Sequence, residues 1–107
     1  MTPETLGALN ASIAKWDANA VAGRPDDYLT GVSDCPLCSL FFGDDCEKCP
    51  VKFKAESKHC SNTPYVAADL AHDRWAFLGG EKFRLAAQSA ARKEAAFLRS
   101  LLPGDAQ

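Results

Sequence analysis

The 107 residues suffice for one small domain and are too few for two independent hydrophobic cores. A composition of 47% hydrophobic and 24% charged residues is typical of a soluble globular protein, and the sequence has no run of about 18 apolar residues that would cross a bilayer. The net charge of -2 excludes the strongly basic balance of a dedicated nucleic-acid binder, although residues 1–47 carry two bases and eight acids while residues 48–102 carry ten bases and five acids.

The first predicted element is a helix over residues 3–20. Thr2 is a good N-cap, and proline at position 3 suits the first helical turn. Apolar residues then recur at intervals of three, four and three, which places them on one helical face: Leu6, Leu9, Ile13 and Trp16. No basic region followed by an apolar run opens the chain, so we expect no secretory signal and a cytoplasmic location.

The segment of residues 35–60 contains all five cysteines and has little periodicity, leaving room for one short β-hairpin at most. Four cysteines form two C-x2-C pairs, "CPLC" and "CEKC", with seven residues between the pairs. Two such pairs supply the four thiolates of a closed, tetrahedral structural zinc site. The candidate ligands are Cys35, Cys38, Cys46, Cys49 and Cys60.

One tetrahedral ion uses only four of the five cysteines. Cys35, Cys38, Cys46 and Cys49 form the simplest set, but Cys60 or the neighbouring His59 can replace a member of the second pair. Cys60 can equally be a small buried hydrophobic residue. An iron–sulfur cluster is the second interpretation and a redox dithiol the third, while an odd number of cysteines in a cytosolic protein disfavours a disulfide framework.

Two further helices are predicted, over residues 64–78 and 81–102. Proline at position 64 opens the first behind Thr63 as a candidate cap, and Gly79-Gly80 ends it. The last helix has an alanine-rich apolar face that allows close packing, either within the chain or against a second copy: Phe83, Ala87, Ala90, Ala91, Phe97, Leu98 and Leu101. The predicted fold is therefore mainly α, a single domain over residues 1–107 with a metal-stabilised cysteine-rich loop.

Catalysis is poorly supported by these residues, and we expect no enzyme. A site with four sulfur ligands has no open position for a substrate or a water molecule. His72 lies beside Asp69 and Asp73 in "DLAHDRW", but a surface histidine on a polar helix is the simpler interpretation of this group.

Two kinds of binding function remain. The first is recognition of a partner protein by a rigid surface that the metal orders, with exposed aromatic residues such as Phe41, Phe42, Trp75 and Phe77 as contacts unless they are buried in the core. The alternative is a nucleic-acid-binding module in which Phe53 and Tyr65 stack on bases and four lysines contact phosphates: Lys48, Lys52, Lys54 and Lys58.

The series "CPLC", "CEKCP", "C" and "NTPY", between a helix with a tryptophan and an alanine-rich helix ending in "FLRSLLP", resembles a group of small cysteine-rich proteins encoded by tailed phages and prophages. The resemblance covers residues 30–102, although Lys48 and Ser61-Asn62 stand where the related pattern has glycine. It implies a phage-encoded accessory protein acting in the host cytoplasm, and it implies that Cys60 is a ligand. We therefore expect a non-enzymatic zinc-binding protein that modulates or inhibits a host protein.

Overall fold

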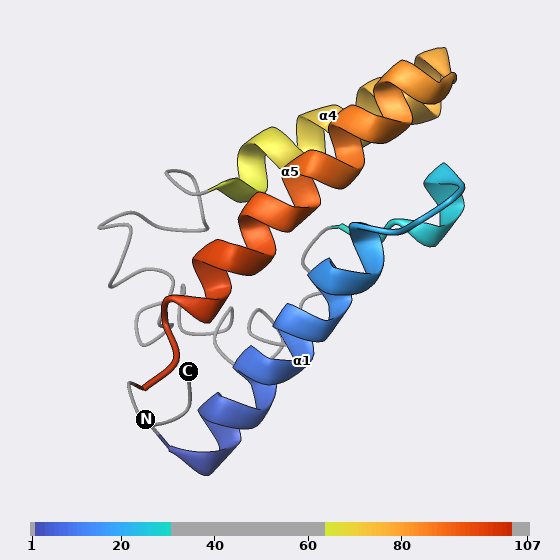
Figure 1. Cartoon of the computed structure of the whole chain (residues 1–107). Helices are drawn as coiled ribbons and strands as arrows, with labels where there is room; N and C mark the ends of the chain where they lie inside the picture. Colours follow the sequence, from blue (N-terminus) through green and yellow to red (C-terminus); the bar gives the residue numbers. More distant parts are fainter. Residues whose placement is uncertain (1, 31–63, 104–107) are drawn as a thin grey trace.

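The computed structural model describes residues 2–30 and 64–103, and these residues are mainly helical, as the sequence predicts (Figure 1). The elements in chain order are α1 (Pro3–Asn19), the short 3-10 helix η1 (Pro25–Asp27), α4 (Pro64–Leu78) and α5 (Glu81–Arg99). Within these two ranges there is no β-strand, and no helix is long and apolar enough to span a bilayer.

α1 begins at the residues that the sequence indicates. The Thr2 hydroxyl accepts a hydrogen bond from the Thr5 backbone N–H at 3.1 Å, which satisfies one of the free donors of the first turn. The predicted apolar face is directed into the core, since Leu9, Ile13 and Trp16 are all buried. One stripe of side chains, from Leu9 to Trp16, therefore packs α1 into the core.

The turn between α4 and α5 depends on two glycines. Gly79 and Gly80 have φ values of +69° and +91°, a backbone region that side chains with a Cβ atom rarely adopt. The Gly79 N–H donates to the Trp75 carbonyl at 2.8 Å and closes α4, and α5 starts soon after, at Glu81. The tight turn makes α4 and α5 an antiparallel helical hairpin (Figure 1).

α5 ends at Arg99, ahead of the predicted end at residue 102. The N–H groups of Leu101 and Leu102 donate three residues back, to the carbonyls of Leu98 and Arg99, so the last turn tightens before Pro103. Helix ends commonly tighten or fray in this way, so the difference concerns the terminal turn alone.

The core lies where α5 packs against α4 on one side and α1 on the other (Figure 1). Ala87, Ala91 and Ala95 of α5 are at most 1% exposed, so the small side chains let the three helices approach closely. The alanine-rich face of the last helix is therefore used inside the chain. The larger buried side chains around it are Leu9, Ile13, Trp16, Tyr28, Trp75 and Leu98.

Candidate functional site

The metal-binding and phosphate-binding residues that the sequence assigns to a site lie outside the described ranges. This holds for the metal candidates Cys35, Cys38, Cys46, Cys49, His59 and Cys60, and for the nucleic-acid candidates Lys48, Lys52, Lys54 and Lys58. The expected β-hairpin and the aromatic residues Phe41, Phe42 and Phe53 fall there too. Among residues 2–30 and 64–103, no three His, Cys, Asp or Glu side chains come together as a metal site would require.

The structure does show how the chain is held where it enters this cysteine-rich segment, which we define as residues 31–63. The Asn19 side chain donates through Nδ2 to the Leu29 carbonyl at 2.9 Å and accepts the Leu29 N–H through Oδ1 at 2.8 Å. The amide thereby satisfies both backbone groups of one residue, and Asn19 itself is buried. The entrance to the segment is fixed to the end of α1.

The exit from the segment is held by α1 as well. Tyr65, the second residue of α4, packs edge-to-face on Trp16 with ring centroids 5.9 Å apart and an interplanar angle of 87°. Trp16 and Asn19 are three residues apart, so they are neighbours on the surface of α1. One turn of this helix therefore holds both ends of the cysteine-rich segment.

Tyr28 joins all the described elements at the centre of this arrangement. Its ring lies edge-on to Trp16 at 5.8 Å and to Trp75 at 6.3 Å, and its hydroxyl donates to the Ala87 carbonyl of α5 at 3.0 Å. Burial, together with the negative charges of Asp69 and Glu94, raises the pKa of the Tyr28 hydroxyl well above its ordinary value. The group therefore stays a neutral phenol at physiological pH and serves as a packing and hydrogen-bonding residue.

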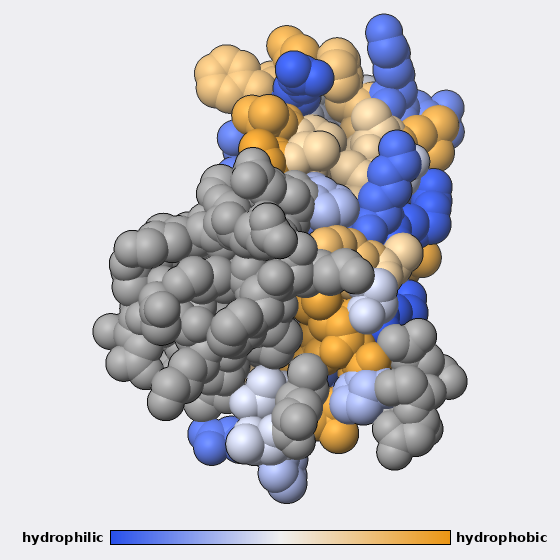
Figure 2. All heavy atoms as spheres, turned by 90° about the vertical axis from the view of Figure 1, so that its left-hand side faces the viewer, coloured by the Kyte–Doolittle hydropathy of each residue, from blue (hydrophilic) through white to orange (hydrophobic). Residues whose placement is uncertain are grey.

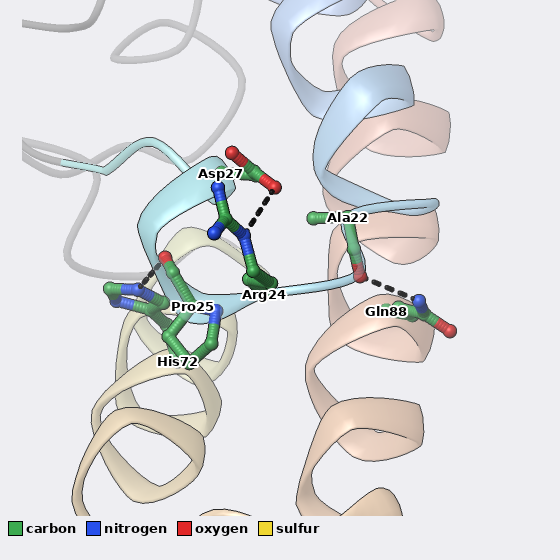
Figure 3. A network of polar contacts seen from close by, with 6 residues as sticks. All are labelled: Ala22, Arg24, Pro25, Asp27, His72 and Gln88. Atoms are coloured by element: carbon green, nitrogen blue, oxygen red, sulfur yellow. Dashed lines mark hydrogen bonds and ion pairs between the residues drawn. The ribbon is translucent and has the colours of Figure 1, made fainter.

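His72 is engaged in packing contacts. Its ring stacks on that of Tyr28, nearly parallel, with ring centroids 4.9 Å apart. Its Nε2 lies 2.9 Å from the Pro25 carbonyl oxygen, as Figure 3 shows. A carbonyl oxygen only accepts, so Nε2 carries the proton. Nδ1 is buried and has no hydrogen-bond partner among residues 2–30 and 64–103. The half-buried ring thus differs from the surface histidine that the sequence suggests, because Tyr28 and η1 cover it.

Two further contacts fix the connection between α1 and η1, as Figure 3 shows. Gln88 of α5 donates through Nε2 to the Ala22 carbonyl at 2.8 Å, and Arg24 pairs with Asp27 at 3.5 Å on the surface. The connection is therefore held from the α5 side by Gln88 and from the α4 side by His72. This connection leads directly to Tyr28 and the entrance of the cysteine-rich segment.

Sequence reasoning places Trp16 on the apolar face of the first helix but misses Asn19 and Tyr28. Asn19 closes the first helix, where an amide is a common local hydrogen-bonding residue, and Tyr28 stands among turn-forming acids. The signal for Tyr28 in the sequence is an aromatic residue within a polar turn, which indicates that its ring is buried. The described groups make a scaffold, and Asn19, Tyr28, Gln88 and His72 Nε2 use their hydrogen bonds to hold the chain together. No family model, curated protein or solved structure matched this chain.

Proposed function

We propose that the chain is a non-enzymatic zinc-binding accessory protein, in which a helical frame presents a metal-ordered segment to a partner protein. The frame consists of residues 2–30 and 64–103, and the segment is residues 31–63. The two C-x2-C pairs and Cys60 support zinc as the ion, with an iron–sulfur cluster as the competing occupant. The resemblance to phage-encoded proteins supports a host protein as the partner that is modulated or inhibited.

The observation that carries the proposal is the anchoring of both segment ends on one turn of α1. Asn19 holds Leu29 through two hydrogen bonds, and Trp16 contacts Tyr65. Joining the ends of a long loop costs conformational entropy, and packing in the frame already provides that closure. Metal binding then needs to order only the interior of the loop. The free energy of metal binding therefore stabilises one defined conformation of the loop surface.

The position of His72 also favours a binding role over catalysis. The imidazole is the best candidate for acid–base chemistry in the sequence, and it is occupied by the Pro25 carbonyl and the Tyr28 ring. Trp75, a candidate surface aromatic residue, is 4% exposed and belongs to the core. A recognition surface built by the cysteine-rich segment is therefore the function that the arrangement supports best.

The first test is the metal content of protein purified without a histidine tag. We expect one zinc ion per chain, and single Cys-to-Ser variants at the five positions should divide into four that lose zinc and one that retains it. Iron and a visible absorbance band in place of zinc would indicate a cluster. Sub-stoichiometric metal with all five thiols free would contradict the proposal.

The second test separates the two kinds of partner. Zinc-loaded protein is used to isolate partners from a bacterial host lysate, and any protein found is then titrated in purified form. In parallel, binding to DNA and RNA is measured over a range of salt concentrations. Saturable binding to a purified protein supports the proposal, whereas nucleic-acid affinity that falls steeply with salt would replace it by the alternative through the four lysines.

A further inference from the structure

α4 carries apolar side chains on the face that is turned away from the core. Val66, Leu70 and Phe77 are 40%, 51% and 93% exposed, whereas Ala68 and Trp75 are buried. At 3.6 residues per turn the three exposed residues lie within an arc of about 40°, on the side opposite the two buried ones. We call Val66, Leu70 and Phe77 the outer stripe of α4. Because apolar side chains on two opposite faces favour burial of both, we expect protein to cover the outer face of α4 as well.

The outer stripe is a particular feature of α4. The solvent face of α5 is mostly charged, with Lys82, Arg92 and Lys93, although it also carries Leu85, which is 51% exposed. The apolar side chains of α4 continue around the end of the hairpin through Leu78, which is 65% exposed. Figure 2 shows apolar atoms at the surface near the top of the view, where the hairpin ends.

Charged residues border the outer stripe with opposite signs on its two sides. From the helical angles, Asp69 lies on one flank and Arg74 on the other, while Asp73 lies at the edge of the stripe itself. The ion pairs within residues 2–30 and 64–103 do not include Asp69, Asp73 or Arg74, so these three side chains make no ion pair with a described residue. Charges on the flanks of an apolar stripe determine whether a second helix packs parallel or antiparallel to it.

The flanks select the orientation of a second copy. In an antiparallel pair related by a two-fold axis like flanks meet, so the Asp69 sides of the two copies would face each other. In a parallel pair opposite flanks meet, and Asp69 of one copy lies beside Arg74 of the second copy, five residues further along. This is the spacing at which flanking charges pair in parallel two-stranded helices. The flanking charges of the outer stripe are therefore complementary in the parallel arrangement.

We propose that the outer stripe of α4 is a self-association surface on which two copies of the chain pack with their α4 helices parallel. The dimer is weak, because one short stripe buries less area than a stable interface requires. Asp73 weakens the dimer further, because it lies between Leu70 and Phe77 along the stripe and faces the same aspartate of the second copy. The proposal does not rest on the zinc site, so the dimer should form equally with and without a chelator.

The direct test is sedimentation equilibrium of the full chain up to about 1 mM, in a thiol reductant that excludes intermolecular disulfides. We expect reversible dimerisation whose dissociation constant rises about tenfold or more in Phe77→Ser. The matched control is Val21→Ser, which changes a residue that is 76% exposed but lies outside the stripe, and which should leave the constant unchanged. A monomer at all concentrations, or equal effects of both substitutions, would overturn the proposal.

A charge-reversal cycle tests the pairing across the two copies. Arg74→Glu alone and Asp69→Lys alone should each weaken the dimer, and the double variant should restore it. Circular dichroism of each variant verifies that the frame is folded. Single effects that merely add in the double variant would show that the two residues do not meet.

The orientation is tested by a photo-cross-linking residue in place of Phe77. Parallel packing predicts cross-links to the hairpin end of the second copy, near residue 77. Cross-links to the opposite end of α4, near Val66, would show an antiparallel pair and contradict the proposed arrangement. Asp73→Leu should strengthen the dimer, while Asp26→Leu, an exposed acid on η1, should not.

Discussion

The helical frame and the cysteine-rich segment obtain their order from different sources. The frame contains no cysteine, and its helices pack through buried aromatic and alanine side chains, with Tyr28 in contact with every described element. The segment contains all five cysteines, and under our proposal it is ordered by zinc. Our proposal therefore predicts that the frame folds without metal, while the segment depends on both the metal and the frame that holds its ends.

Replacing Trp16 by alanine should have the largest effect on the frame. Trp16 is 2% exposed and contacts Tyr28 and Tyr65, so its loss leaves a cavity at the point where both segment ends are held. We expect a loss of about 3–5 kcal/mol in the free energy of unfolding, which is most of the stability of a small domain. Urea unfolding followed by circular dichroism measures it.

The matched control for this substitution is Phe77→Ala, because Phe77 is aromatic but 93% exposed. In dilute protein its effect on the free energy of unfolding should be within about 0.5 kcal/mol. If both substitutions destabilise the protein to the same degree, the core is not arranged as described.

Asn19→Ala comes next, because it removes both hydrogen bonds to Leu29 and leaves the two backbone groups without their partner. The expected loss is about 2 kcal/mol. Asn10→Ala, an exposed asparagine on the same helix, is the control and should be close to neutral. Asn19→Ala should also lower the zinc affinity, since the segment would then lose its fixed entrance, and an unchanged affinity would mean that the segment folds independently of the frame.

Tyr28→Phe tests a single hydrogen bond, from the tyrosine hydroxyl to the Ala87 carbonyl, and should cost about 1 kcal/mol at neutral pH. The raised pKa of Tyr28 adds a pH dependence. The folded protein retains this proton in a range where the unfolded chain releases it, so the free energy of unfolding falls as pH rises above about 10. The fall should be shallower in Tyr28→Phe, and equal slopes in the two proteins would contradict the buried hydroxyl.

Asp27→Asn should have the smallest effect. The pair with Arg24 lies on the surface, with side chains 75% and 54% exposed, so water and salt screen it. We expect a change below about 0.5 kcal/mol in the same urea titration. A large loss would mean that η1 depends on this ion pair and not on the contacts of Pro25 and Tyr28.

The helices could be predicted closely from the sequence, for local reasons. Thr2-Pro3 and Gly79-Gly80 specify helix ends through capping and backbone conformation, and the interval between apolar residues identifies the buried faces. These signals are contained in a few neighbouring residues. Whether the alanine face packs within the chain or against a second copy is open in the sequence, and the burial of Ala87, Ala91 and Ala95 shows that it packs within the chain.

The contacts between distant residues could not be predicted. Tyr28 bonds to Ala87, 59 positions later, and His72 bonds to Pro25, 47 positions earlier, so no local pattern connects them. The aromatic residues of α4 look alike in sequence, yet Trp75 is buried and Phe77 is exposed, because the helix turns them to opposite sides. The cysteine ligands remain a prediction, since they lie outside the described residues.

Our central claim is that the cysteine-rich segment depends on metal and the frame does not. Amide hydrogen exchange on the zinc-loaded protein, before and after a chelator removes the metal, tests this claim most directly. We predict that protection is lost in residues 31–63 and retained in α1, α4 and α5, and that added zinc restores it. Exchange in residues 31–63 that is the same with and without metal, or a simultaneous loss of protection in all three helices, would contradict this division of the chain.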